Sequence, residues 1–167
     1  MHTRLIIPVL ISFAGISALI APTFNRSSEL TPTFIATGAN TLSCMLNDKE
    51  ISENTYLNAE VVHESELFYL NLWMGEGHQN RITFVLKDEE ISEKTYDLDD
   101  TNKRYVTFSF HQMTCTYTSD EYYSGMLMIN TYDKEQKIIA GSFEFIAFSD
   151  DCNELVRIKD GQFDAMF

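Results

Sequence analysis

The chain has 167 residues, with 12 Lys and Arg against 25 Asp and Glu, so its formal net charge is −13. Hydrophobic residues make up 44% of the chain against only 7 Gly and 3 Pro, which excludes collagen-like, low-complexity and disordered classes. The length suits one domain. A chain this acidic, with scattered basic residues, is expected to bind neither nucleic acid nor an anionic membrane surface.

The N-terminus carries the pattern of an export signal. Arg4 precedes Leu5–Ile20, a stretch without any charged residue. We predict a signal peptide over residues 1–21, cleaved somewhere between Gly15 and Ala21. The apolar stretch is shorter than the about 20 residues of a membrane span, so a permanent anchor made by an uncleaved segment is the second choice. The exported protein is then expected in the periplasm, at the cell surface or outside the cell.

Residues 22–38 are expected to form a linker, because they are rich in Ser and Thr, include Pro32 and show no periodicity. From Ala39 onward the dominant pattern alternates apolar and polar residues with period 2, and no window of eleven residues carries a helical stripe. We predict a single all-β domain over residues 39–167. The expected architecture is an antiparallel β-sandwich or barrel of about eight to ten short strands.

The first expected strands follow this alternation. Residues 42–46 place Leu42, Cys44 and Leu46 on one face, ahead of a turn at Asn47–Lys49. Residues 68–74 and 82–86 flank the turn Gly75–Gly77, which predicts a hairpin. Its first strand has Phe68, Leu70, Leu72 and Met74 on one face, with Tyr69, Asn71 and Trp73 on the other.

Later segments repeat the pattern. Val106, Phe108 and Phe110 are expected to point inward. Residues 125–132 and 138–148 flank the polar turn 133–136, which predicts a second hairpin with a core face of Leu127, Ile129, Phe143 and Phe145. The chain closes with residues 155–159 and 162–167 around Asp160–Gly161, the strongest hairpin signal present. The acidic clusters 88–90 and 97–100 are expected in loops.

Three stretches, one near the start of the predicted domain and two near its end, resemble a known family. Thr37–Asn47 (TGANTLSCMLN) resembles an opening that typically reads TGANTFGC, followed by a VNGK-like turn. Residues 139–147 (IAGSFEFIA) and 156–164 (VRIKDGQFD) resemble a close of the form ISGTFEFTA and V-x-I-T-D-G-R-F-D. These motifs belong to a family of exported bacterial proteins, mostly lipoproteins of Bacteroidota, known only as a domain of unknown function.

The resemblance implies an envelope-associated β domain and brings no catalytic residues with it. The chain departs from the family pattern in two places. It has no lipidation cysteine after its apolar stretch, and Gln162 stands where a basic residue is usual.

Catalytic and metal-binding motifs are not apparent, so neither enzyme activity nor a cofactor is expected. The chain has no G-x-S-x-G, H-E-x-x-H, phosphate-loop or C-x-x-C motif. The spacing of His63, His78 and His111 does not demand a zinc site. Asp97–Asn102 resembles the start of a calcium loop, but it lacks the Gly at position six and the Glu at position twelve, which favours an ordinary turn.

Aromatic side chains offer the best candidate binding residues. Tyr69 and Trp73 share a strand face, and Tyr122 and Tyr123 lie in a polar loop. Exposed rings stack on sugars or anchor protein interfaces, so the expected partner is a glycan or an unknown envelope protein. The alternative, which we favour for Tyr69 and Trp73, is that the sheet is covered on both faces and these rings form a second core layer.

These observations predict a non-catalytic exported β domain that serves as a binding or structural accessory module at the cell envelope. The alternative is a carrier of a small apolar ligand, held in a barrel cavity lined by residues such as Phe84, Phe108, Phe143 and Met74. A cavity of several hundred cubic ångströms would favour the carrier. A packed interior with an exposed aromatic strip would favour the binding module.

The three cysteines permit one disulfide. A hairpin turn centred on Lys134 and Glu135, extended outward, places residue 152 opposite about residue 117. Cys115 and Cys152 therefore fall within a slip or bulge of the spacing that a disulfide requires. Cys44 shares a face with apolar neighbours, as a small buried hydrophobe does. We predict a Cys115–Cys152 bond with Cys44 reduced.

Overall fold

The computed structural model describes residues 36–53, 57–77, 80–87, 90–110 and 115–167. Within these residues all regular structure is β, in one antiparallel sheet of eleven strands, which confirms the predicted all-β class. The strand number exceeds the predicted eight to ten. The described part of the chain contains no helix long and apolar enough to cross a membrane. The predicted signal peptide 1–21 and most of the predicted linker 22–38 lie outside the described residues.

The strands follow one another along the sheet in the order β2-β1-β11-β10-β8-β7-β5-β4-β3, with β9 paired to β10 and β6 paired to β9. Their bounds are as follows: β1 Thr41–Leu46, β2 Lys49–Glu53, β3 Asn58–Glu64, β4 Leu67–Met74, β5 Asn80–Lys87, β6 Thr95–Asp97, β7 Arg104–Phe110, β8 Thr116–Thr118, β9 Gly125–Asp133, β10 Ile138–Ser149 and β11 Glu154–Met166.

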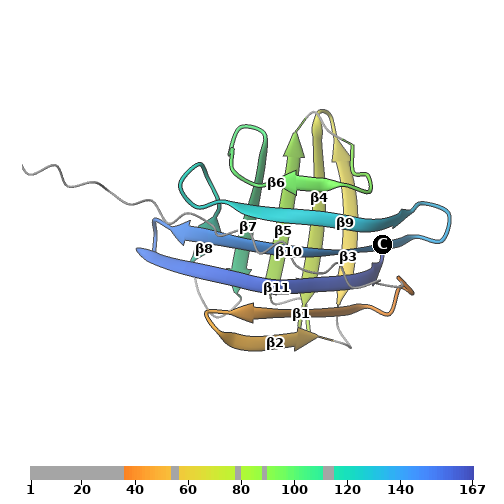
Figure 1. Cartoon of the computed structure of the whole chain (residues 1–167), viewed down its shortest axis with the longest axis horizontal. Coiled ribbons are helices and arrows are strands. Elements are labelled where there is room, and N and C mark those ends of the chain that lie inside the picture. The colour runs from red at the N-terminus through yellow and green to blue at the C-terminus, as the bar shows by residue number, and fades with distance from the viewer. Residues whose placement is uncertain (1–35, 54–56, 78–79, 88–89, 111–114) are drawn as a thin grey trace, which may run out of the picture.

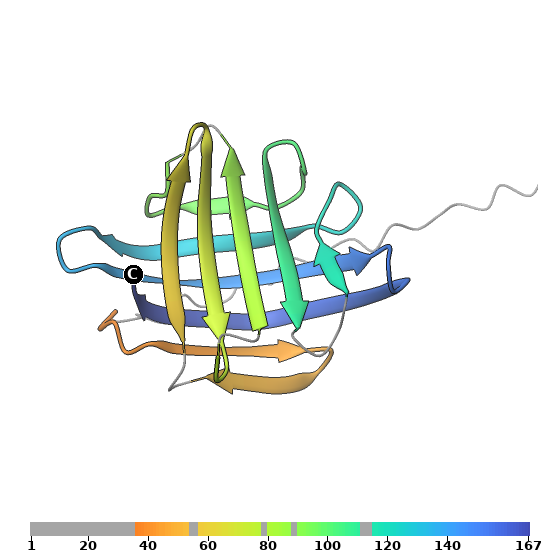
Figure 2. The same cartoon turned by 180° about the vertical axis from the view of Figure 1, so that it is seen from behind.

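The sheet turns back on itself at the short strand β8, which joins two layers. Strands β3, β4, β5 and β7 form one layer, which we call the front layer (Figure 2). Strands β1, β9, β10 and β11 run crosswise to it and form the back layer, which lies nearer the viewer in Figure 1. Because β2 and β3 stand at opposite ends of the strand order, the sheet stays open. The architecture is therefore a half-barrel that packs its two arms face to face.

The core lies between the two layers and is built from the inward residues that the alternation predicted. Phe84 of the front layer meets Phe143 of the back layer edge-on, with ring centroids 5.6 Å apart. Phe108 contacts Phe145 in the same manner at 6.5 Å. The four residues assigned to a cavity wall by the carrier hypothesis are all buried members of this core: Met74, Phe84, Phe108 and Phe143.

The Asp160–Gly161 pair does not form the predicted hairpin turn. Strand β11 runs straight through it, and the pairing register with β10 shifts at this point, which marks a β-bulge. Asp160 takes a left-handed conformation with φ of 52°. A Cβ on Gly161 would lie 2.5 Å from the backbone oxygen of Phe143, so only glycine permits this close approach. The hairpin prediction was wrong because a bulge needs the same backbone freedom as a turn.

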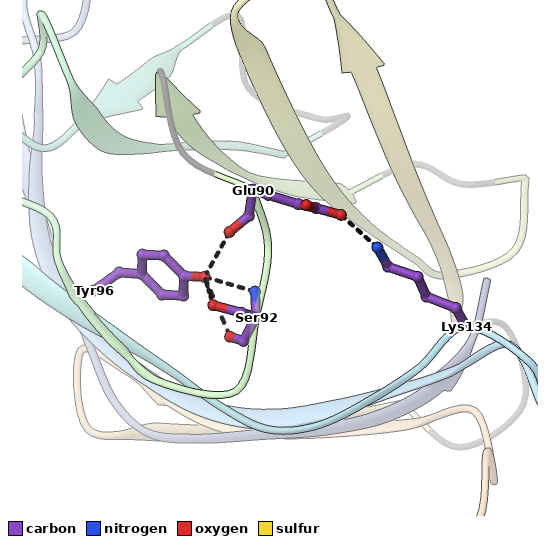
Figure 3. A network of polar contacts seen from close by, with 4 residues as sticks. All are labelled: Glu90, Ser92, Tyr96 and Lys134. Carbon is purple, nitrogen blue, oxygen red and sulfur yellow. Dashed lines mark hydrogen bonds and ion pairs between the residues drawn. The ribbon is translucent and has the colours of Figure 1, made fainter.

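The acidic segment 97–100 was predicted as a loop, and its residues 98–100 lie outside the named strands, whereas Asp97 is the last residue of the short strand β6. Strand β6 pairs with β9, and Tyr96 and Leu98 are fully buried. The Tyr96 hydroxyl accepts the Ser92 backbone N–H at 2.8 Å, and Glu90 forms an ion pair with Lys134 of the β9–β10 turn (Figure 3). Two inward residues are too few to show a strand periodicity in the sequence.

The disulfide joins Cys115 and Cys152, with their Cα atoms 5.8 Å apart, as predicted. The strand pairing differs from the expected single hairpin. The pairing of β9 with β10 stops at Gly125, and the separate strand β8, which precedes β9 in the chain, takes the next position along the same edge of β10. The bond therefore ties β8 to the β10–β11 turn. Cys44 is free and buried, also as predicted, and burial raises the pKa of its thiol to about 11.

Candidate binding face

The outward residues of β3, β4, β5, β7 and β8 form a continuous surface, which we call the front face (Figure 2). No described segment lies over it in this view. Antiparallel pairing without bulges puts directly paired residues on the same side of a sheet, so these outward residues fall into rows across the strands. The first row is Asn58–Trp73–Arg81–Ser109–Thr116, the second is Glu60–Asn71–Thr83–Thr107–Thr118, and the third is Val62–Tyr69–Val85–Tyr105.

Trp73 is the largest ring of the first row. It is half-buried, and the guanidinium carbon of Arg81 on the next strand lies 4.8 Å from the ring centroid. A cation over an indole face is attracted by the ring quadrupole, which fixes the orientation of the ring. The first row therefore presents a held, flat aromatic group beside a strong hydrogen-bond donor.

The second row forms a hydrogen-bonded chain of neutral side chains that ends in a carboxylate. The Thr83 hydroxyl donates to Asn71 Oδ1 at 2.8 Å, and Asn71 Nδ2 donates to Glu60 Oε2 at 3.2 Å. The row continues through Thr107 and Thr118 on β7 and β8. The centre of the front face is consequently polar and uncharged.

The third row carries two tyrosines on either side of Val85. Val85 points outward yet is only 3% exposed, which places it among the shielded residues of this face. Tyr69 and Tyr105 are half-buried. Burial, and secondarily the nearby Tyr69, raise the pKa of Tyr105, so its hydroxyl stays neutral near pH 7 and can both donate and accept hydrogen bonds.

The predicted second core layer over Tyr69 and Trp73 has no counterpart among the described residues. Both side chains are half-buried, and Figure 2 shows no described strand or loop over the layer that carries them. The structure thus places this predicted pair on the front face, two strand positions on either side of Asn71. Tyr105 was not singled out from the sequence. Its position alternates with those of the inward residues Val106 and Phe108 in the same strand, which assigns its side chain to the outer face.

Tyr122 and Tyr123 lie in the loop between β8 and β9, where Asp120 Oδ1 accepts the backbone N–H groups of both, at 2.7 and 2.8 Å. Tyr122 is 63% exposed, and the Glu121 carboxylate raises its pKa. Tyr123 stacks on Phe148 of β10 with ring centroids 5.4 Å apart.

Phe148 connects this loop to the front face. It pairs with Thr118, which pairs in turn with Thr107, so Phe148 extends the second row onto β10. The two pairs of aromatic residues predicted as separate candidates therefore belong to one outer surface. The sequence could have assigned Phe148 to the outer face, because its position alternates with those of the inward residues Phe145 and Ala147 in the same strand.

A surface groove of about 500 Å³ opens at the end of the front face beyond the third row. It lies between the β3–β4 turn and residues 101–103, and Tyr105 of the third row is one of its lining residues. Its polar lining mixes cations and carboxylates, among them Glu64, Glu66, Lys87 and Lys103. Such a mixture can donate to and accept from hydroxyl groups of a ligand.

The histidines and the acidic loop do not gather into a metal site within the described residues, where no group of three His, Cys, Asp or Glu side chains is close enough to hold an ion. His63 instead stacks on Phe68 with centroids 4.0 Å apart. Asp100 Oδ1 accepts the Asn102 backbone N–H at 2.8 Å, as in an ordinary turn. His78 and His111 lie outside the described residues.

Comparison with known proteins places the chain in a family without assigning it an activity. No curated protein and no solved structure matches the chain. A family model described as a domain of unknown function, DUF6252, matches residues 72–166, which is more than half of the chain. This match includes Trp73, Tyr105, Tyr123, Phe148 and both cysteines of the disulfide. The chain therefore belongs to the DUF6252 family.

Proposed function

We propose that the protein is a non-catalytic exported module of the cell envelope that binds a neutral glycan through its front face. The observation that carries this proposal is the juxtaposition of Trp73, Tyr69 and Tyr105 with the hydrogen-bonded row around Asn71 and Thr83. A sugar ring has an apolar face, which stacks on aromatic rings, and polar edges, which bond to amides and hydroxyls.

Charge favours a neutral ligand. The chain carries a formal net charge of −13, so anionic polymers are repelled at long range. The centre of the front face holds amide and hydroxyl side chains, whereas the core of a protein interface is typically apolar and aromatic. A glycan is therefore favoured over the second predicted partner, an envelope protein.

The edge-on contact of Phe84 with Phe143, two residues that the carrier alternative places on a cavity wall, supports an outer binding face over that alternative. Inside the described domain a hollow of about 60 Å³ lies beside Cys44, Met74 and Phe108, at one end of the core. Ligand pockets typically measure about 300 to 1,000 Å³, several times this volume. The larger groove beside Tyr105 lies at the surface, next to the proposed binding face.

Export is supported by the disulfide, because such bonds persist in oxidising compartments such as the periplasm or the extracellular space. The apolar stretch Leu5–Ile20 supports the same compartment. The absence of catalytic motifs from the sequence supports a role in binding rather than in catalysis.

Affinity electrophoresis tests the proposal. The purified protein is run through native gels that contain xylan, β-glucan, mannan or the acidic polymer alginate. We expect at least one neutral polymer to retard the protein and alginate to leave its mobility unchanged. Trp73→Leu should abolish the retardation, while Tyr132→Leu, a ring on β9 outside the front face, should keep it. Equal mobility of the wild-type protein in every gel would contradict the proposal.

A further inference from the structure

We infer that the corner of the domain beside β8 docks a basic protein, one that presents Lys or Arg side chains around an aromatic or aliphatic centre. The docking surface, which we call the corner patch, consists of four residues from the β8–β9 loop and the facing ends of β10 and β11: Tyr122, Tyr123, Phe148 and Leu155. This inference does not depend on the proposed function, because the rings assigned there to the glycan lie on β4 and β7.

Exposed apolar side chains gather at this corner. Among the described residues three large hydrophobic side chains are exposed, and two of them, Tyr122 at 63% and Leu155 at 42%, belong to the corner patch. Tyr123 stacks on Phe148, and Phe148 pairs directly with Leu155 in the ladder between β10 and β11. Directly paired residues lie on the same side of a sheet with their Cβ atoms about 5 Å apart. The corner patch is therefore a connected apolar surface rather than a set of isolated side chains.

The segments that carry the corner patch are held in place. In the β8–β9 loop the Asp120 carboxylate accepts two backbone N–H groups, and the Asp120 N–H donates to Tyr123 O at 2.9 Å. At the end of this loop the N–H of Ile146 on β10 donates to Ser124 O at 3.0 Å. The β10–β11 turn lies beside the loop (Figures 1 and 2) and is fixed by the disulfide of Cys152. A surface that is ordered before binding loses little conformational entropy on association.

Carboxylates flank the corner patch. The segments 119–124 and 148–155 contain no Lys or Arg, and they carry five acidic residues: Asp120, Glu121, Asp150, Asp151 and Glu154. All of these are exposed except Asp120, which is half-buried. The outward cation of the next row is Arg157, which pairs with Ile146. Because the carboxylates outnumber this cation, the corner carries a negative potential that attracts a basic partner and speeds its association.

This charge decides between the possible occupants of the corner patch. A second copy of the chain would bring the same carboxylates into contact with themselves, and each chain has a formal net charge of −13. A neutral glycan would find no hydrogen-bonding group on the side chains of Phe148 and Leu155. Protein interfaces, in contrast, typically combine aromatic anchors at the centre with a polar rim. The partner that complements this patch is therefore a protein with an apolar centre and a basic rim.

Selection from a displayed library of random dodecapeptides on the purified protein tests the inference. We expect the enriched peptides to combine Lys or Arg with Leu, Phe or Trp. Calorimetric titration then measures the Kd of these peptides. The double variant Tyr122→Ala with Leu155→Ala should raise this Kd by at least about tenfold, because it removes the exposed anchors. Tyr122→Phe, which keeps the ring, should bind as the wild-type protein does, and circular dichroism checks that each variant is folded.

A second pair of variants separates the charge of the corner from the charge of the whole chain. Asp150→Asn with Asp151→Asn should slow the association of the enriched peptides by about threefold at low salt. The matched control is Glu76→Gln with Glu135→Gln, which removes the same charge at exposed positions in two other turns. It should leave the association rate within about twofold of the wild-type rate.

Three outcomes would overturn the inference. One is a selection without enrichment of basic peptides, or with peptides that the double variant of Tyr122 and Leu155 binds unchanged. Another is equal slowing by the two charge variants, which would show that the overall charge attracts the peptides. The third is loss of retardation of the Tyr122 and Leu155 double variant in the neutral polysaccharide gels, which would make the corner patch part of the glycan site. Equal mobility of the wild-type protein in all gels would contradict the proposed function alone.

Discussion

The carboxylate of Asp164 binds Thr37, 127 positions earlier in the chain. Asp164 Oδ2 accepts the backbone N–H and the hydroxyl of Thr37 at 2.9 and 2.8 Å, and Oδ1 accepts the N–H of Gly38 at 2.8 Å. Asp164 is only 3% exposed. The three bonds fasten the residues before β1 onto the last strand. They also join the first and the last of the sequence stretches that carry the family resemblance, since Thr37 opens the first and Asp164 closes the last.

Asp164→Ala should lower the free energy of unfolding by about 3 kcal/mol, because it leaves donors of Thr37 and Gly38 without their charged acceptor. Urea denaturation followed by fluorescence measures the change. Asp150→Ala, at an exposed position in the β10–β11 turn, is the matched control and should stay within about 0.5 kcal/mol of the wild-type protein. Equal effects of the two substitutions would show that the Asp164 contacts do not stabilise the fold.

Loss of the Cys115–Cys152 bond should lower the free energy of unfolding by about 3 to 4 kcal/mol, because the open chain regains the entropy of a loop closed across 37 positions. Urea denaturation with and without a reductant measures this difference. The Cys44→Ala variant should respond to the reductant as strongly as the wild-type protein. Non-reducing peptide mapping that linked Cys44 to either partner would contradict the assigned bond.

Stability should fall between about pH 9 and pH 11 through Cys44. Burial raises the pKa of its thiol from 9.0 to about 11, so the unfolded chain releases this proton at lower pH than the folded protein does. The contribution of the neutral thiol is complete below pH 9 and lost as the pH reaches 11, by about 3 kcal/mol.

Denaturation at both ends of this pH range, for the wild-type protein and for Cys44→Ala, isolates that contribution from the tyrosines that also titrate there. The stability difference between the two proteins should shrink by about 3 kcal/mol as the pH rises. A difference that is independent of pH would show that the thiol titrates normally in the folded protein.

Gly161→Ala should destabilise the protein by about 2 to 3 kcal/mol, because the added methyl group would meet the backbone and ring of Phe143 in the β11 bulge. Thermal unfolding measures the loss. Gly77→Ala provides the comparison: the new Cβ has open space, and only its φ of 74° is unfavourable, which costs about 1 kcal/mol. A milder effect at Gly161 than at Gly77 would contradict the close approach of β10 and β11.

The sequence by itself determined the all-β class, the inward and outward faces of individual strands and the disulfide. Side-chain direction in a strand depends only on parity, so Tyr69 and Trp73 could be assigned to the face opposite Leu70 without knowledge of the fold. The Cys115–Cys152 pairing followed from a local hairpin, because β9 and β8 succeed one another on the same edge of β10.

The tertiary structure alone decided which strands become neighbours across long stretches of chain. Local alternation carries no information about the insertion of β8 between β7 and β10, which pairs Phe148 of β10 with Thr118 at the edge of the front face. It also cannot separate a turn from a bulge at Asp160–Gly161, because both require the same backbone freedom. Pairing between distant strands is fixed only when the two layers pack their inward faces together, since burial of those faces sets the register that parity leaves open.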